Sequence, residues 1–261
     1  MKAIEKTPIK TQSPRSNAVA HGVDCIAPRF SRRFLRIAKN AGKWILRIGL
    51  GLALAAVIIL GFFAVKGVVL YNSAMEENPI ETTVELIRQR EDFVPIDELP
   101  DYYIKAVKAV EDRKFDTHCG INIMSICRAL WHDIRTLSFE QGGSTITQQL
   151  AKNLFFTQEK RPERKFAEIY AAFSLEKKYN KDEIFELYVN TIYFGSGYYG
   201  IADAAAGYCD KMPTELSEYE CAMLAGLPNA PSAYSPDVSP ELAEQRTKQV
   251  FKAVEEWEIS G

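Results

Sequence analysis

Charge is absent from one long stretch of this 261-residue sequence, between Ile48 and Val65. Such a run excludes an ordinary surface helix, which needs a polar face, and helices of soluble proteins rarely extend this far without one. As a helix the stretch spans about 27 Å, close to the hydrocarbon thickness of a bilayer. Trp44 and Tyr71 flank it, where aromatic side chains favour the membrane interface. We therefore predict a transmembrane anchor over residues 44–71, with a buried core helix as the alternative.

Acidic residues are scarce before this stretch. Residues 1–47 contain two Asp and Glu but eleven Lys and Arg, whereas the remainder of the chain is acidic overall. The positive-inside rule predicts that residues 1–43 form a basic tail in the cytoplasm and that residues 72–261 lie outside. We interpret the tail as a topology signal that touches anionic lipid, and we predict no nucleic-acid partner. A cleaved secretory signal is the alternative, although its basic region would be unusually long.

The sequence has no Cys-x-x-Cys pair, which argues against a zinc site built from paired cysteines. Four of its five cysteines lie in the part predicted to be exported, where disulfides are permitted: Cys119, Cys127, Cys209 and Cys221. Pairing of Cys119 with Cys127, pairing of Cys209 with Cys221, and burial as free thiols are the open alternatives. The exported part has no internal repeat or low-complexity tract and is long enough for one domain.

Helical periodicity dominates the exported part. Apolar residues recur at helical spacing from Tyr103 onward, which predicts a helix that ends near Glu111. Further helices are predicted at residues 121–137, 144–156, 163–179, 181–192, 199–209, 215–226 and 240–257. The predicted fold class is therefore mostly α, with residues 101–261 as one domain.

Residues 72–100 are predicted to be a juxtamembrane connector between the anchor and this domain. Within it, Thr83-Val84-Glu85-Leu86-Ile87 and Phe93-Val94-Pro95-Ile96 are rich in β-branched and aromatic residues. Such composition is typical of strands, so we predict two short strands there.

Glu111 is the first candidate for chemistry. It follows Val107 and Val110 on one helix face, with Phe115 one turn later and His118 beyond that. A carboxylate at the apolar end of a helix is partly desolvated, which raises its pKa and suits a general base. The alternative is a solvated ion without a chemical role.

A polar segment led by two glycines follows, beginning Gly142-Gly143-Ser144-Thr145. Ser144 or Thr145 is a natural N-cap for a helix, and a helix N-terminus with free N–H groups binds anions. Gln149 and Lys152 place further polar groups along that helix. The segment therefore predicts a phosphate site, with a capped helix that has a solvated polar side as the alternative.

Arg164 and Glu168 are four residues apart and share a helix face, and Lys165 stands three residues before Glu168. A surface ion pair of this kind contributes less than about 1 kcal/mol. In a site, the same residues supply a second carboxylate held by a guanidinium. Two acids, a phosphate site and several cations together favour glycosyl transfer with a diphosphate leaving group.

Four ordered motifs resemble those of the peptidoglycan glycosyltransferase family. That family includes the glycosyltransferase domain of class A penicillin-binding proteins and the monofunctional, membrane-anchored biosynthetic peptidoglycan transglycosylases. The motifs are Glu111-Asp-x-x-Phe-x-x-His-x-Gly, Gly142-Gly-Ser-Thr-x-Thr-Gln-Gln-Leu-x-Lys-Asn, Arg164-Lys-x-x-Glu and Lys181-x-x-Ile-x-Glu-x-Tyr-x-Asn190. The resemblance covers residues 83–254, and four motifs in order make a chance match improbable.

The resemblance implies a lysozyme-like, two-lobed helical domain with a membrane-proximal jaw, preceded by one transmembrane helix. It implies lipid II as the substrate, a β-1,4 glycan on undecaprenyl diphosphate as the product, and other cell-wall synthesis proteins as partners. The implied location is the bacterial cytoplasmic (inner) membrane, with one span and the catalytic domain outside. Ile134, Leu137 and Phe139 are interpreted either as part of a jaw that enters lipid or as core.

By the same resemblance, Glu111 is the catalytic base that deprotonates the acceptor 4-hydroxyl, and the donor anomeric carbon is attacked with inversion. Glu168 is the second catalytic residue and assists the departing diphosphate. A divalent cation (Mg²⁺ or Mn²⁺) also fits this reaction, with Glu168 as its candidate ligand, because the developing phosphate charge needs compensation.

Six further residues are implied to bind substrate: Phe115, His118, Thr145, Gln149, Lys152 and Arg164. Lys152 and Arg164 are implied to bind the diphosphate, with Thr145 and Gln149 nearby. Phe115 and His118 are implied to shape the pocket of the base.

Some residues depart from the family pattern. The fifth motif is seen as Arg246, Val250-Phe251 and Val254, and Cys209-Asp210 stands where the family usually has an aromatic and a small residue. Ser174-Leu-Glu-Lys177 matches the acylation motif of transpeptidases, but the chain has no Lys-Thr-Gly and we reject that reading.

Two other functions stay open. A glycan-cleaving lytic transglycosylase or lysozyme also needs a catalytic Glu in a helical fold, but it does not need Lys152 and Arg164. A non-catalytic scaffold of the cell-wall machinery would keep the fold without the chemistry, and the intact pair of Glu111 and Glu168 argues against it.

Overall fold

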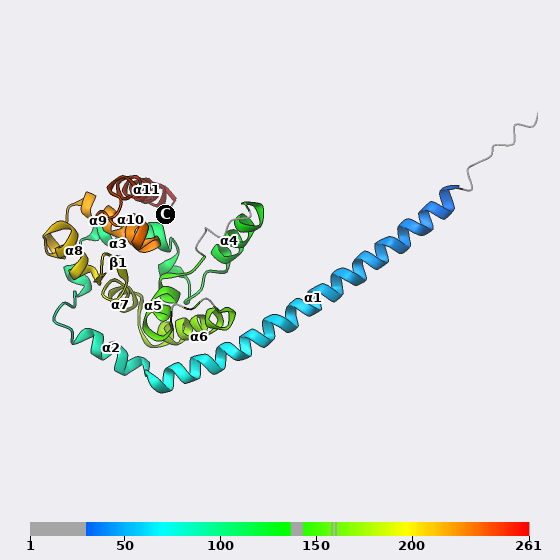
Figure 1. The fold of residues 1–261 in the computed structure, drawn as a ribbon, viewed down its shortest axis with the longest axis horizontal. Helices are drawn as coiled ribbons and strands as arrows, with labels where there is room; N and C mark the ends of the chain where they lie inside the picture. Colours follow the sequence, from blue (N-terminus) through cyan, green and yellow to red (C-terminus); the bar gives the residue numbers. More distant parts are fainter. Residues whose placement is uncertain (1–29, 137–142, 158, 160, 261) are drawn as a thin grey trace, which may run out of the picture. The chain divides into compact units, whose positions relative to one another are not determined.

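The computed structural model describes residues 30–136, 143–157, 159 and 161–260 (Figure 1). Helices dominate this part of the chain, which confirms the predicted mostly α fold class. The α-helices are α1 Phe30–Glu77, α2 Ile80–Arg88, α3 Asp101–Glu111, α4 Ile123–Thr136, α5 Ile146–Phe155, α6 Pro162–Lys178, α7 Lys181–Val189, α8 Ile201–Cys209, α9 Glu218–Gly226, α10 Pro231–Tyr234 and α11 Pro240–Ser260. Short 3₁₀ turns lie at η1 Ile96–Glu98, η2 Phe115–Thr117, η3 Pro213–Glu215 and η4 Leu227–Asn229. Leu137, Phe139 and the side chain of Ile134, which we assigned to a jaw or to the core, lie outside the described part.

Helix α1 contains the predicted anchor. Its segment Lys43–Glu77 is long and apolar enough to cross a membrane, by length and composition. Side chains from Trp44 to Leu60 are exposed, and exposed apolar surface is costly in water, so a bilayer suits this segment. The chain divides into two compact units, Met1–Ala56 and Val57–Gly261, and the candidate site lies in the second. The domain boundaries given above stay predictions.

The strands predicted between residues 83 and 96 are wrong. Helix α2 occupies the first of the two segments, and the second is irregular chain that leads into η1. A helical period is present in α2, because its buried residues are Ile80, Val84 and Ile87. β-branched composition suggested a strand, but the packing of this face against the core decides in favour of helix. Val94 and Leu99 belong to the same hydrophobic core.

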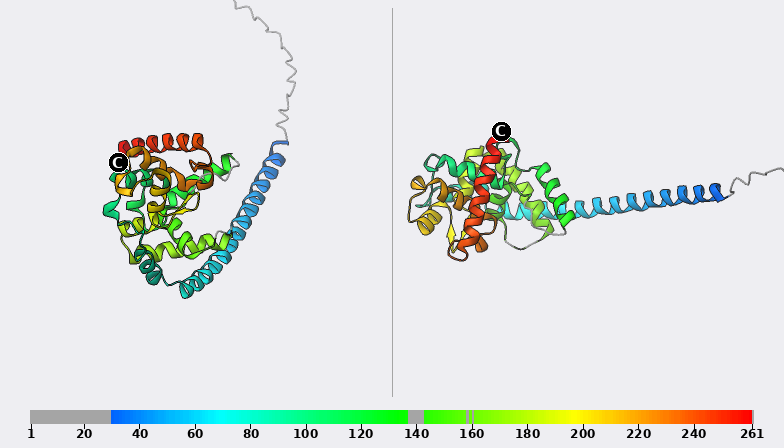
Figure 2. Two further views of the ribbon diagram at one scale, coloured as in Figure 1. Left: turned by 60° about the vertical axis from the view of Figure 1, so that its left-hand side comes forward. Right: turned by 90° about the horizontal axis from the view of Figure 1, so that it is seen from above.

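The helices of the second unit form two groups. Helices α3, α9 and α11 pack on one another, and helices α5, α6 and α7 pack on one another. Figure 1 shows the first group above the second, and α4 at the edge beyond both; Figure 2 shows α4 at the edge again from two other directions. One hydrophobic core joins the groups and includes Tyr103 of α3, Leu150 of α5 and Leu224 of α9.

A small hairpin interrupts the helices. Strands β1 Tyr193–Gly195 and β2 Tyr198–Tyr199 pair antiparallel, an arrangement that the sequence did not predict. Its turn needs left-handed backbone, with φ of 95° at Gly195 and 91° at Gly197, which glycine adopts without steric cost. The rings of Tyr193 and Tyr199 lie with their centroids 4.7 Å apart across the hairpin.

Helix α1 approaches α6 closely at Gly67. A Cβ atom at this position would lie 2.4 Å from Cβ of Phe166, so only glycine fits. One turn further on, the hydroxyl groups of Tyr71 and Ser174 share a hydrogen bond of 2.7 Å. The end of the predicted anchor is therefore attached to α6, the helix that carries Glu168.

Gly67→Ala tests this attachment. The added methyl group has to push α1 from α6, because the opposing Phe166 atom is a Cβ that cannot rotate away. We expect the free energy of unfolding to fall by about 1–3 kcal/mol. Urea unfolding of the full chain in detergent measures it. Gly61→Ala is the matched control, since nothing lies within 4 Å of its added Cβ, and equal unfolding midpoints for the two variants would contradict the close approach.

Candidate active site

The candidate site lies where the two groups of helices meet, at the end of α3 and the start of α5. Glu111 is the last residue of α3, and Gln149 lies in the first turn of α5. Nε2 of Gln149 donates a hydrogen bond of 2.6 Å to Oε2 of Glu111. The next residue, Asp112, accepts a bond of 3.2 Å from the backbone N–H of Ile146. Two adjacent carboxylates thus join α3 to α5.

Glu111 has one oxygen held and one oxygen free. Oε1 is buried and has no hydrogen-bond partner among the described residues. Burial raises the pKa of the Glu111 carboxyl, while the bond from Gln149 and the positive charge of Arg246 partly oppose the rise. The direction of this shift agrees with the position of Glu111 at the apolar end of its helix. A carboxyl with a raised pKa holds and releases protons closer to neutral pH, as acid–base catalysis requires.

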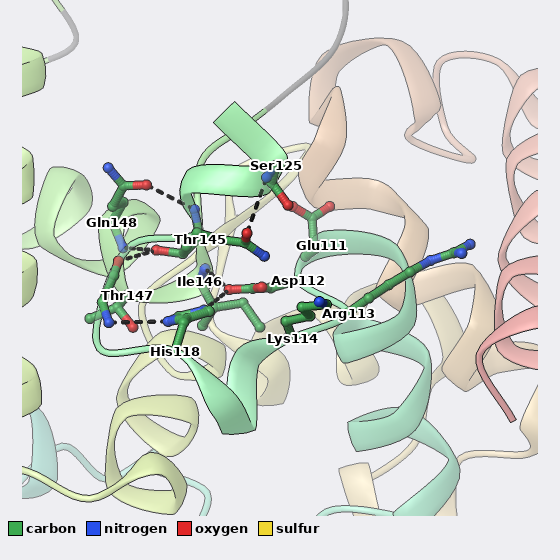
Figure 3. Close-up of polar contacts among 12 residues, drawn as sticks. Glu111, Asp112, Arg113, Lys114, His118, Ser125, Thr145, Ile146, Thr147 and Gln148 are labelled. Atoms are coloured by element: carbon green, nitrogen blue, oxygen red, sulfur yellow. Dashed lines mark hydrogen bonds and ion pairs between the residues drawn. The ribbon is translucent and has the colours of Figure 1, made fainter. Parts of the chain in front are cut away.

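Two cavities flank this carboxylate. Glu111 itself lines a cavity of about 100 Å³, together with Ser125 of α4 and Thr145. Figure 3 shows the Glu111 side chain pointing toward Ser125, whereas Arg113 points away from it. A larger cavity of about 580 Å³ is lined by Gln149, Lys152 and residues of the hairpin. Gln149 connects the two cavities, because it lines the larger one and bonds Glu111, which lines the smaller one.

Asp112 was missed by the sequence reasoning. Its side chain is buried, and its Oδ2 accepts a bond of 2.7 Å from Nε2 of His118 as well as the bond from Ile146. Nδ1 of His118 accepts from the N–H of Gly120 at 3.1 Å, so the proton of the neutral ring is on Nε2. Nothing local in the sequence indicates that the chain folds back over Asp112.

Phe115 and His118 lie behind the site rather than in it. Phe115 is buried, and its ring centroid lies 6.1 Å from that of His118 and 6.2 Å from that of Phe185. Neither residue belongs to the lining of the cavity around Glu111. In this structure His118 supports Asp112 through its hydrogen bond, and Phe115 packs against His118.

Thr145 is the N-cap of α5, which confirms the predicted helix start. Its Oγ1 accepts a bond of 3.1 Å from the N–H of Gln148 and donates one of 2.6 Å to the carbonyl of Gly120. Oε1 of Gln148 accepts from the N–H of Thr145 in return, which completes a capping box (Figure 3). The Thr145 hydroxyl therefore has its proton committed to the fold, although the residue lines the cavity.

Cations surround Glu168, which is 2% exposed. Nζ of Lys165 donates to its Oε2 at 2.9 Å, and Nε of Arg164 lies 3.0 Å from its Oε1 without the alignment of a hydrogen bond. These contacts confirm the predicted shared helix face. Burial lowers the pKa of the Lys152 ammonium, and the charges of Glu168 and Glu111 oppose the fall. Lys152 thus lies within electrostatic reach of both carboxylates.

The cluster of Lys152, Arg164 and Lys165 carries more positive charge than Glu168 neutralises. Lys165 also donates a bond of 2.7 Å to the Ser144 hydroxyl, which ties α6 to the segment before α5. Lys165 was not among the predicted site residues, although its spacing from Glu168 was the available signal. An excess of cations at a partly buried site favours an anionic ligand.

The described side chains do not by themselves fit a divalent cation. No group of three or more His, Cys, Asp or Glu among them could hold a metal ion. Both oxygens of Glu168 face cations, which disfavours a further positive charge there. The divalent cation expected from the resemblance therefore stays a prediction, and the chemistry below does not depend on it.

Cys119, Cys127, Cys209 and Cys221 are free in this structure. Cys119 and Cys127 are exposed, whereas Cys209 is partly buried and Cys221 is buried. Burial raises the pKa of the Cys221 thiol to about 12, which makes it a poor nucleophile. The predicted alternative of buried free thiols therefore describes Cys221, whereas Cys119 and Cys127 are free but exposed.

Comparison with known proteins agrees with this geometry. Residues 76–255 match the family model described as Transglycosylase, so the chain belongs to the transglycosylase family. It is 48% identical over 164 residues to penicillin-binding protein 1A of Aquifex aeolicus (strain VF5). This alignment covers 63% of this chain and 23% of that protein. It is 44% identical over 163 residues to penicillin-binding protein 1A of Neisseria gonorrhoeae. That alignment covers 62% of this chain and 20% of the relative. The matched region thus spans about a fifth to a quarter of the length of these relatives.

Asp112→Ala tests the junction between α3 and α5. The substitution leaves the Nε2–H of His118 and the N–H of Ile146 without their acceptor. We expect the free energy of unfolding to fall by about 1–3 kcal/mol for each buried donor that stays unpaired. Urea unfolding measures it. Asp116→Ala removes an exposed carboxylate that pairs with Lys108, and we expect it to change stability by less than about 1 kcal/mol. Equal losses in the two variants would show that Asp112 does not hold the junction.

The raised pKa of Glu111 makes the stability of the folded protein depend on pH. Folding favours the protonated carboxyl, so its contribution to stability is present at acid pH and is lost as pH rises through the folded pKa. We therefore expect Glu111→Gln to be more stable than the unmodified protein at pH 7, with the difference vanishing near pH ~4. Unfolding at several pH values measures this. Glu91→Gln, at an exposed position, should show no such trend, and a pH-independent difference for Glu111→Gln would refute the burial of its charge.

Proposed function

We propose that this protein is a peptidoglycan glycosyltransferase that polymerises lipid II into β-1,4 glycan strands in cell-wall biosynthesis. One observation carries the proposal: Glu111 is partly buried, its buried Oε1 has no hydrogen-bond partner among the described residues, and it lies near a cluster of three cations that Glu168 alone does not neutralise. This combination suits the transfer of a sugar from a diphosphate. Membership of the transglycosylase family and similarity to proteins named penicillin-binding protein 1A support it.

In this proposal Glu111 is the general base. Gln149 holds Oε2, so Oε1 is the atom available to take the proton of the acceptor 4-hydroxyl. The acceptor oxygen then forms a bond to the donor anomeric carbon from the face opposite the leaving group, which inverts that carbon. The bond from this carbon to the diphosphate breaks, the electron pair leaves with the diphosphate, and the proton stays on Glu111.

The leaving diphosphate gains negative charge as that bond breaks. Lys152, Arg164 and Lys165 offer preorganised positive charge, which stabilises such a transition state strongly in a partly buried site. Glu168 contributes by fixing the positions of Arg164 and Lys165 on α6. A diphosphate departs as an anion, so this role does not require Glu168 to donate a proton.

Membrane attachment follows from the substrate. The lipid carrier stays in the bilayer, so the site has to operate at the membrane surface, and the α1 anchor raises its effective concentration there. Helix α4, which contributes Ser125 to the cavity, exposes Ile123, Met124 and Trp131. Exposed apolar and aromatic side chains on a helix suit contact with lipid. We place the N-terminus in the cytoplasm and the domain outside the bacterial cytoplasmic membrane, where other cell-wall synthesis proteins are the expected partners.

Cleavage of finished glycan is the alternative activity. A lysozyme-like enzyme needs a carboxylic acid to protonate a sugar leaving group. Glu168 is a poor candidate for such an acid because Lys165 and Arg164 already occupy its two oxygens. The cation cluster therefore favours the transferase over the hydrolase, and the unpaired Oε1 of Glu111 disfavours a scaffold without chemistry.

Glu111→Gln tests the proposed reaction. Removing the base should lower polymerisation of purified lipid II by about 100-fold or more, while the variant stays folded. The rate of glycan formation measures it, with Glu91→Gln as the control expected to retain activity. The transferase proposal is wrong if the unmodified protein leaves lipid II unchanged and shortens finished glycan.

A further inference from the structure

A groove on α4 continues the cavity around Glu111 toward α11. It has a volume of about 490 Å³, within the range of about 300–1,000 Å³ that small-molecule sites occupy. Three cations line it, Arg113, Lys114 and Arg128, together with Met124 and Trp257. We call it the basic groove. Arg113 and Arg128 line the cavity around Glu111 as well, so a molecule in that cavity can extend into the groove.

The basic groove has no acidic side chain among the described residues that line it. Arg113 pairs with Glu256 at 3.0 Å outside the groove, in a contact where both side chains are about half exposed. Arg128 donates to the Ser125 hydroxyl at 3.2 Å, a neutral partner. The Lys114 carbonyl accepts a bond of 3.0 Å from the Thr117 hydroxyl, but the Lys114 ammonium has no hydrogen bond or ion pair with another described residue. The groove therefore carries positive charge that an anion can neutralise.

Apolar surface accompanies this charge. Nε1 of Trp257 donates to the carbonyl of Arg113 at 3.2 Å, which holds the indole of α11 at the wall of the groove. Met124 of α4 is 72% exposed beside the cations. Charged groups together with a flat apolar wall suit a ligand that carries carboxylates on an aliphatic backbone. A peptide has this chemistry, whereas an unmodified sugar does not.

We propose that the basic groove binds the carboxylates of the peptide attached to lipid II, next to the sugar that reacts at Glu111. The inference rests on the proposed function. Lipid II has two anionic parts, its diphosphate and its peptide. The diphosphate already has a match in Lys152, Arg164 and Lys165, which lie on α5 and α6. The cations of the basic groove remain available for the peptide. Because the groove and the cavity share lining residues, these cations lie within reach of a peptide whose sugar is bound at Glu111.

Lys114→Glu tests the groove, because this exposed residue lies outside the machinery assigned to the reaction. The substrates are lipid II with free peptide carboxylates and lipid II with those carboxylates converted to amides. We expect KM for the free-carboxylate substrate to rise about three- to tenfold, with kcat within about twofold, and the effect to shrink in roughly 0.5 M salt. The amidated substrate should show no change in KM. Equal changes for both substrates would overturn the proposal.

Lys248→Glu is the matched control. Lys248 is an exposed cation of α11 that pairs with Glu244 and does not line the groove, so the variant makes the same change of charge elsewhere. We expect it to leave KM for both substrates unchanged. A rise like that of Lys114→Glu would mean that net charge alone sets KM, which also overturns the proposal.

A binding measurement separates this inference from the proposed function. The chain has three tryptophans, so changing Trp44 and Trp131 to Phe leaves Trp257 as the reporter in the groove. Binding of the free peptide should change the fluorescence of Trp257 saturably, and Lys114→Glu should weaken that binding. Such binding without polymerisation of lipid II would defeat the proposed function and retain the groove. No binding that depends on Lys114 would defeat the groove.

Anionic lipid is the competing occupant, because α4 exposes apolar residues close to the groove. Flotation with vesicles of phosphatidylcholine, with and without phosphatidylglycerol, distinguishes it. We expect Lys114→Glu to bind each kind of vesicle as strongly as the unmodified protein does. A loss of binding only to the anionic vesicles, with KM unchanged for both substrates, would assign the groove to membrane lipid and overturn the proposal.

Discussion

The hydrogen bonds that join the end of α3 to the start of α5 are the constraint on which the rest of the site depends. Glu111 meets Gln149, and Asp112 meets the first backbone N–H of α5, so adjacent residues bind the same helix in different ways. Asp112 is satisfied by two donors, whereas Glu111 keeps an unpaired buried oxygen. Burying a carboxylate that is not fully paired costs free energy, and the fold bears that cost at Glu111, the carboxylate that we propose as the base.

Charge is divided between the two sides of this junction. On α5 and α6, three cations surround one buried carboxylate, which avoids the high cost of an unpaired buried charge and still leaves positive charge for a ligand. On the side of α4 and α11, the basic groove has cations without an acidic wall. Glu111 lies between these two regions, so the substrate that we propose, with two anionic parts, would be oriented across it. The candidate membrane span in α1, which contacts α6 at Gly67, would limit such a site to substrates at the membrane.

Much of the fold and part of the site could be predicted from the sequence, because those features are local. The helical period located α3 and the helices after it, the cap at Thr145 followed from residue type, and the pairing of Arg164 with Glu168 followed from a spacing of four residues. The same period was present in α2, but β-branched composition favoured strands there, and the packing of Ile80 and its neighbours against the core decided otherwise.

The sequence by itself determined the family and most of the helices, and it predicted the membrane anchor and the two catalytic glutamates. Only the tertiary structure decided that Asp112 is buried, that Phe115 lies behind the site, and that Gln149 holds Glu111. It also decided that Lys114 faces a groove without acids. The physical reason is distance along the chain. Contacts within one or two helical turns are set by the 3.6-residue period, whereas Gln149 and Glu111 are 38 residues apart and meet only when both groups of helices pack on their common core.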